Sequence, residues 1–184
     1  MTEQLMEIGE RLRALRNIMD ISAGTMAERM NLDIAEYMAY EQGDRDFSFS
    51  FLFNAAGILG VDIVDIISGD TPRLTTCSLI RRGEGYHIVR QQAYDYRHLA
   101  FTFAGKKAEP FMVTVEPSGD EEVNPHSHNG QEFNYMVSGS LEFYLDNMMY
   151  VLEEGDSVYF DSGISHAMRA RSGQPAQFIA VVIK

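Results

Sequence analysis

The apolar positions in the first seventy residues recur at intervals of three and four, which is the spacing of one face of a helix. In the first helix this stripe consists of Leu5, Ile8, Leu12, Leu15 and Ile18. Side chains suited to cap a helix, each followed by apolar periodicity, predict four further short helices at residues 22–30, 33–41, 48–59 and 60–69. Five short helices in so few residues predict a compact bundle.

After the segment SGDTPR the period of the pattern changes to two, which is typical of strands. The clearest alternating segments are FMVTVEP, SLEFYLDNMMYVLEEGDSVYF and QFIAVVIK, and Asp146-Asn147 suits a two-residue hairpin turn. Short strands at regular spacing favour an antiparallel β-barrel. We therefore expect an α+β protein of two domains, with a helical domain at residues 1–69, a linker at 70–84 and a barrel domain at 85–184.

Composition limits the environment and the partners of the chain. Its only cysteine, Cys77, excludes an intrachain disulfide and fits a reducing cytoplasm. No apolar run approaches the length of a membrane span, and the first residues lack the pattern of a signal peptide. The net charge is −12, yet residues 71–110 carry seven Lys/Arg against three Asp/Glu. Any binding of nucleic acid must therefore use a local basic face.

The helical half resembles the Xre/Cro-type helix-turn-helix domain of bacterial regulators, which is a five-helix bundle of the lambda-repressor type. The resemblance is carried by IGERLRALRNIMDIS, by the Glu41-Gln42-Gly43 turn and by AAGILGVDIVDII. It implies that the third helix, at about residues 33–40, enters the major groove of DNA. This helix has no Arg, Lys, Gln or Asn, which are the usual readers of bases.

The DNA contacts that we expect from this resemblance are therefore mainly contacts to phosphate. Our candidates are Arg11, Arg16, Ser22, Tyr37, Tyr40 and Arg45. The alternative is a bundle that serves as a scaffold or a dimerisation element without binding DNA.

Four residues of the second half have the side chains that bind transition metals. His126 and His128 would project from the same face of a strand, Glu132 follows after a possible bend at Gly130, and His166 ends EEGDSVYFDSGISH. Imidazoles with one carboxylate suit Fe, Mn, Zn, Ni or Co without selecting among them. The alternative for any single histidine is a hydrogen-bonded residue near a turn.

The spacing of these residues resembles the two sequence motifs of the cupin superfamily. His126, His128, Glu132 and Gly139 match the first motif, and Gly155, Gly163 and His166 match the second. Asp161 stands where the family usually has proline, and Ala170 where it often has asparagine. The resemblance implies a metal site with one or two open coordination positions, or a cupin that binds its ligand without a metal.

The basic segment before the first motif offers candidates for an anion site. If its alternating side chains point into the barrel, then Arg90, Tyr96 and His98 would contact an anionic effector. The alternative is a solvated face that offsets the acidic charge of the rest of the chain.

The combined architecture is similar to bacterial one-component regulators, in which a cupin domain senses a small molecule and a homodimer binds an operator. This implies a cytoplasmic DNA-binding regulator with a small, anionic effector. A second group with the same architecture is hydroxypropylphosphonate epoxidase, a non-haem iron oxidoreductase in which His128, Glu132 and His166 would hold the metal. The sequence leaves open whether the protein is an enzyme, and a metal-dependent isomerase or dioxygenase is a third possibility.

Overall fold

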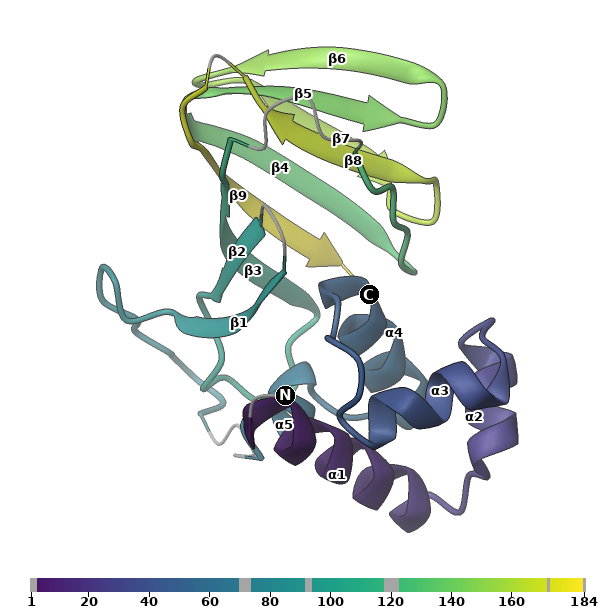
Figure 1. Cartoon of the computed structure of the whole chain (residues 1–184). Coiled ribbons are helices and arrows are strands. Elements are labelled where there is room, and N and C mark those ends of the chain that lie inside the picture. Colours follow the sequence, from purple (N-terminus) through teal and green to yellow (C-terminus); the bar gives the residue numbers. More distant parts are fainter. Residues whose placement is uncertain (1–2, 70–73, 92–93, 118–122, 172, 184) are drawn as a thin grey trace. The chain divides into compact units, whose positions relative to one another are not determined.

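The structure is a computed structural model that describes residues 3–69, 74–91, 94–117, 123–171 and 173–183. The chain divides into two compact units, Met1–Leu74 and Thr75–Lys184. The boundary lies within the segment that we expected to be a linker. Figure 1 shows that the first unit is built from helices and the second from strands.

The helical unit contains the five helices predicted from the periodicity: α1 (Glu3–Ile18), α2 (Ala23–Arg29), α3 (Ile34–Glu41), α4 (Phe49–Leu59) and α5 (Ile63–Ile67). Their N-termini are fixed by the chain's own side chains, because Ser22, Asp33 and Ser48 each accept a hydrogen bond from a backbone N–H in the first turn. Asp62 forms a capping box with Asp65 at α5. No described helix combines the length and the hydropathy that a membrane crossing needs.

Helices α1 and α3 approach each other backbone to backbone. A Cβ on Gly9 would lie 2.7 Å from the carbonyl oxygens of Tyr40 and Glu41, and a Cβ on Gly43 would lie 2.8 Å from the Cα of Met6. Gly43 also has a φ of 74°, which favours glycine. Both glycines are therefore required by this contact, and Ile8 and Leu12 of α1 are fully buried beside it.

The sheet unit consists of nine strands among the described residues: β1 (Tyr86–Gln91), β2 (Tyr94–His98), β3 (Ala108–Val115), β4 (Gln131–Ser138), β5 (Ser140–Leu145), β6 (Met148–Glu153), β7 (Ser157–Asp161), β8 (His166–Ala170) and β9 (Ala176–Ile183). They form a six-stranded sheet in the order β1-β2-β3-β9-β4-β7 and a three-stranded sheet in the order β6-β5-β8. All described pairings are antiparallel. The antiparallel architecture is confirmed, with two sheets in place of one closed barrel.

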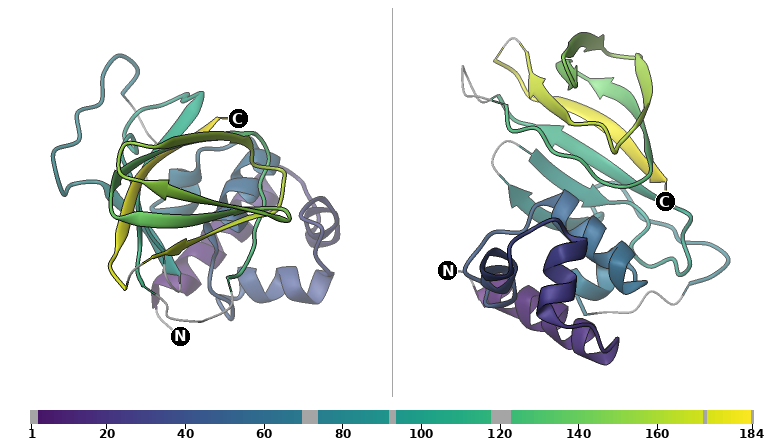
Figure 2. Two further views of the ribbon diagram at one scale, coloured as in Figure 1. Left: turned by 90° about the horizontal axis from the view of Figure 1, so that it is seen from above. Right: turned by 90° about the vertical axis from the view of Figure 1, so that its right-hand side faces the viewer.

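The two sheets lie face to face (Figure 2), and apolar side chains of both, such as Phe143 and Phe178, are buried. Phe143 of β5 lies 4.9 Å from Phe160 of β7 between ring centroids, and Tyr94 of β2 bonds the backbone of Met168 on β8. Along β3 and β9 every second residue is buried, as the period of two predicted. The hairpin between β5 and β6 turns through Asp146 and Asn147, with Asp146 at a φ of 50°.

Candidate metal centre and helical surface

The expected metal ligands come from three neighbouring parts of the sheet unit. Glu132 lies on β4, His166 begins β8, and His126 and His128 lie in the segment before β4. The backbone N–H groups of His126 and His166 each donate to the carbonyl oxygen of the other at 2.9 Å. Asp161, at the position that is usually proline in cupins, accepts a bond from the N–H of Gly163 at 2.9 Å and so shapes the turn before His166.

Three of the four expected ligands form one buried cluster. Metal-binding atoms of His128, Glu132 and His166 all lie within 4.8 Å of one another. Their side chains are almost wholly withdrawn from solvent, and His128 Nε2 lies 3.0 Å from Glu132 Oε2. Burial of a carboxylate and two imidazoles is costly unless they share a partner, which points to a ligand-binding role for the cluster.

The hydrogen bonds of the histidines leave their Nε2 atoms available to a metal. His166 Nδ1 donates to the carbonyl oxygen of Ile164 at 2.8 Å, so the neutral ring carries its lone pair on Nε2. That Nε2 atom is buried and has no hydrogen-bond partner among the described residues. His128 Nδ1 faces the carbonyl oxygen of Asn129 at 3.3 Å, and its Nε2 lies 3.0 Å from Glu132 Oε2, where a proton on the nitrogen bridges the two atoms. A metal ion could take the place of that proton and accept the lone pair of His166 Nε2, so the residues fit a metal ion.

The protonation states of the cluster suit metal binding at neutral pH. Burial, together with the nearby His166, lowers the pKa of His126 to about 4. Burial also lowers the pKa of His166. Burial opposes the charge of Glu132, but hydrogen bonds from His128 and Asn134 outweigh it and hold the pKa of that carboxyl below its usual value. His126 and His166 can thus be neutral while the Glu132 carboxylate is charged, as metal coordination requires.

His126 lies beside the cluster and is not one of its three members. Its ring centroid is 4.4 Å from that of His166 and 6.3 Å from that of Tyr94. The expectation that His126 and His128 project from one face assumed a strand, whereas only His126 forms a bridge there and residues 127–130 are irregular. Strand alternation therefore does not fix the direction of the two side chains relative to each other.

Asn134 is a residue of the centre that the sequence reasoning did not find. Its amide donates to Glu132 Oε1 at 2.8 Å, and its side chain is buried. The available signal was its position two residues after Glu132, on the same face of β4. Asn134 orients the carboxylate, as partners behind a metal ligand commonly do.

The residues expected to bind an effector do not share one environment. Tyr96 pairs with the buried Val113 of β3 and its ring lies 6.4 Å from that of Phe111, so Tyr96 faces the interior of the sheet unit. Burial, with the nearby Tyr94 and Glu132, raises the pKa of Tyr96 well above its ordinary value. His98 is fully buried, bonds Glu109 at 2.7 Å and accepts from the N–H of Ala100. These contacts give His98 a structural role. The side chain of Arg90 lies outside the described residues.

On the helical unit, two of the candidate DNA contacts are buried. Arg16 bonds both oxygens of Glu41, at 2.5 and 3.0 Å, and the carbonyl oxygen of Ile21 at 2.8 Å. Tyr37 is fully buried, and burial raises its pKa. Their burial removes both from the set of candidate DNA contacts, because phosphate cannot reach them.

The other candidates are accessible to different extents. Arg11 bonds the last carbonyl oxygens of α5, those of Ile66 and Ile67, and so closes the end of that helix. Ser22 caps α2. The side chain of Arg45 is 49% exposed, pairs with Glu36 and lies over the ring of Tyr40. Arg45 is therefore the best placed of the candidates to contact phosphate.

The outward surface of α3 is apolar rather than basic. Ile34 is 53% exposed and Met38 is 42% exposed. Such a surface can contact thymine methyl groups but offers no hydrogen bonds to base edges.

Comparisons with known proteins agree with this architecture. Residues 111–182 match the family model described as a cupin domain. A search of curated protein sequences finds no significant match. An HTH_3 family transcriptional regulator from Vibrio cholerae has a similar structure, with a TM-score of 0.74 and 18% identity over 98% of this chain and 97% of that one.

Structures of hydroxypropylphosphonic acid epoxidase are also similar. The enzyme from S. wedmorenis gives a TM-score of 0.53 and 21% identity over 99% of this chain and 100% of that one. Its Fe(II) form gives the same TM-score and identity over 98% and 100%. The fold thus joins a five-helix bundle, similar to that of the Vibrio cholerae regulator, to a sheet unit of which residues 111–182 match the cupin model, and the sheet unit contains a His-Glu-His cluster.

Proposed function

We propose that this protein is a DNA-binding transcriptional regulator whose cupin domain senses a small, anionic molecule at a metal site. The observation that carries the proposal is the combination of a helix-turn-helix-type bundle with a cupin domain that has a buried His-Glu-His cluster. Such a regulator acts on the chromosome, which agrees with the cytoplasmic location expected from the sequence.

The metal would be held by His128, Glu132 and His166, with His126 as the fourth ligand expected from the sequence. The donor set suits Fe, Mn, Zn, Ni or Co. A divalent ion there would supply a Lewis-acidic centre for an oxygen atom of the effector. Asn134 would hold Glu132 in place, and Tyr96 would donate a hydrogen bond from the interior because its raised pKa keeps it protonated.

For DNA, Arg45 and the hydroxyl groups of Tyr40 and Ser22 are the contacts that accessibility supports. These side chains would contact phosphate groups and so position the protein on the DNA. The affinity for DNA should therefore fall steeply as the salt concentration rises. The apolar outward side of α3 would read shape and methyl groups in the major groove.

The test is selection of genomic DNA fragments by the purified protein at about 0.1 M salt, where phosphate contacts are still weakly screened. We expect enrichment of one or a few discrete sites, and an Arg45→Ala variant should lose them. Lys107→Ala is the matched control, because it removes one exposed positive charge from the other unit. If no fragment is enriched, with or without metal, the protein is not a regulator of this kind.

We also propose that the protein acts as a homodimer, since operators of this class are usually paired half-sites. The edge strand β6 supports a subunit contact, because Met148, Met149 and Tyr150 are exposed on it at 54%, 51% and 44%. Sedimentation analysis should give twice the chain mass, and Met149→Glu should reduce it to one chain. A monomeric wild-type protein would contradict this proposal.

The composition of the cluster favours a second candidate, a non-haem metal-dependent oxidoreductase. Two histidines and one carboxylate, without His126, are the facial triad of many iron oxygenases. The test is oxygen or peroxide consumption by the Fe(II)-loaded protein with a hydroxyalkylphosphonate. Turnover that is lost in His166→Ala would establish the enzyme, whereas absence of turnover together with a discrete DNA site would exclude it.

A further inference from the structure

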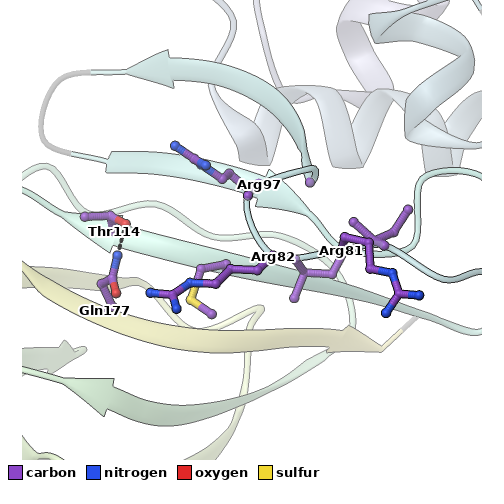
Figure 3. A pocket seen from close by; sticks show the side chains of 10 residues that line it. Arg81, Arg82, Arg97, Thr114 and Gln177 are labelled. Atoms are coloured by element: carbon purple, nitrogen blue, oxygen red, sulfur yellow. Dashed lines mark hydrogen bonds between the residues drawn. The ribbon is translucent and has the colours of Figure 1, made fainter.

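The sheet unit contains a cavity of about 370 Å³, which is lined in part by three arginines. Arg81 and Arg82 belong to the segment before β1, and Arg97 lies on β2. Thr114 of β3 and Gln177 of β9 form the opposite wall, where the Gln177 amide donates to the Thr114 hydroxyl oxygen at 3.1 Å. Figure 3 shows Arg82 extended toward these two side chains, whereas Arg81 points away from them.

The cavity lies on the face of the six-stranded sheet opposite to the metal cluster. Glu132 pairs with Val182 of β9, and the buried residues of β9 alternate with outward ones. Gln177 is one of the outward residues of β9, and it pairs with Thr114 of β3. Both side chains therefore lie on the opposite face of the sheet from Glu132. On β2, Arg97 alternates with the inward Tyr96. Strand register alone thus separates this cavity from the His-Glu-His site.

The wall formed by the segment before β1 depends on a close backbone approach. A Cβ on Gly85 would lie 3.1 Å from the Cβ of Arg97 and 3.3 Å from the carbonyl oxygen of His98. Gly83 turns the chain with a φ of 84°. The two glycines bring Arg82 over the outer face of β2, so the juxtaposition of Arg82 and Arg97 is built by the backbone.

The charge of the cavity is positive although the whole protein is strongly acidic. The Arg82 side chain makes no ion pair with any residue in the described part of the chain, and Arg97 has a single carboxylate neighbour there, Asp95, at 3.5 Å. Asp95 is shared with His87, which lies 3.0 Å from its other oxygen. The guanidinium groups of Arg82 and Arg97 against one shared carboxylate leave an excess of positive charge.

We propose that this cavity binds a small organic anion that carries a carboxylate or a phosphate group, independently of the metal centre. Arg82 and Arg97 would hold the anionic group with charge-assisted hydrogen bonds, which planar guanidinium groups form in pairs. The Thr114 hydroxyl would donate a further bond, since its oxygen already accepts from Gln177. Leu99 and Met112 add apolar surface for the carbon skeleton of the ligand. Binding would tie the segment that follows the helical unit in the chain to the outer face of the sheet.

The experiment is calorimetric titration of the full-length protein with inorganic phosphate, succinate and glycerol phosphate. We expect one of the organic anions to bind with a Kd of about 1 mM or tighter. Arg82→Gln and Arg97→Gln should each weaken binding by at least about tenfold, the usual effect of a lost hydrogen bond to a charged group. Thr114→Val should weaken it less.

Two control variants test whether the anion binds at these arginines rather than at a general positive surface or at the metal cluster. Lys107→Gln removes an exposed positive charge elsewhere in the sheet unit and should leave the affinity unchanged. Glu132→Gln alters the metal cluster and should also leave it unchanged, so this test is independent of the proposed regulator function. Absence of binding, unchanged binding in both arginine variants, or loss of binding in Glu132→Gln would overturn the proposal. Equal affinity for inorganic phosphate would overturn the assignment of an organic ligand, because the apolar wall would then contribute nothing.

Discussion

The two units each bury charged side chains, but they do so in opposite ways. In the helical unit, Arg16 and Glu41 bond each other through two hydrogen bonds, and Arg16 adds a carbonyl oxygen. In the sheet unit, His128 bonds Glu132, but the third member of the cluster, His166, leaves its Nε2 without a partner among the residues described.

This difference separates a structural group from a binding group. Opposite charges that complete each other's hydrogen bonds hold α1 against α3 and need nothing further. A buried nitrogen lone pair that has no donor and lies within 4.8 Å of a buried carboxylate is stabilised by a bound cation, so the same degree of burial indicates a ligand site. Substitutions in the first group should therefore change stability alone, whereas substitutions in the second should change metal affinity.

The largest effect should come from Glu132→Gln, which removes the negative charge of the cluster. We expect metal affinity to fall by about a thousandfold, more than the 10- to 100-fold loss caused by changing a partner behind a ligand. Metal titration followed by calorimetry measures this. Glu154→Gln, at an exposed position of the same unit, is the matched control, and equal losses in the two variants would contradict the assignment.

Arg16→Met should destabilise the helical unit by about 3 kcal/mol, because it leaves Glu41 buried without its partner. Hydrogen exchange of the α1 and α3 amides would measure the loss, and metal affinity should not change. The double variant with Glu41→Leu should recover most of the stability, since an apolar pair of similar volume replaces the ion pair. If the double variant is as unstable as the single one, then the ion pair contributes stability that an apolar pair of similar volume cannot replace.

The metal-free sheet unit should lose stability as pH falls from about 6.5 to about 4. In this window the unfolded chain protonates His126 at its ordinary pKa, whereas the folded pKa of about 4 keeps the ring neutral. We expect a loss of about 2 kcal/mol, less than the full linkage value because the ring is only half-buried. Exchange of the β4 and β8 amides at several pH values measures it. His126→Gln should reduce this dependence on pH and leave the part that His166 contributes, whereas an unchanged dependence would contradict the lowered pKa of His126.

Asn134→Ala should have the smallest effect, a loss of metal affinity of about tenfold. It removes the hydrogen bond to Glu132 Oε1 but leaves all the ligands in place. Asn134→Asp would keep the shape but place a second negative charge beside the carboxylate. If alanine has no effect on metal affinity, then Asn134 serves only the packing of β4.

Much of the fold could be predicted because its signals are local. The caps at Ser22, Asp33 and Ser48, the period of the apolar residues and the hairpin at Asp146 are all encoded within a few residues of the element they define. The members of the buried cluster could be anticipated because His128 and Glu132 lie four positions apart, beside His126, at the spacing of a known motif.

What could not be predicted depends on partners that are distant in the sequence. An arginine on a helix is usually exposed, and only Glu41, 25 residues later, makes the burial of Arg16 possible. The arginine cavity combines Arg82, Arg97 and Gln177, which lie in three separate segments. The position of His126 outside the cluster follows from an irregular backbone, which residue spacing does not reveal.

Strand order in the sheet unit also determines which strand edges remain unpaired while the chain is being translated. β9 is the last strand in the chain, yet it lies between β3 and β4 and pairs with both. Roughly 60 residues are translated between the end of β3 and the start of β9, which takes roughly 3 to 12 seconds, and during this time β3, and later β4 as well, presents an unpaired edge. The helical unit has no such interval, because its described hydrogen-bonded partners precede residue 70. A nascent chain therefore carries a folded bundle and an open sheet at the same time, and the open sheet is the part that a ribosome-associated chaperone would have to protect.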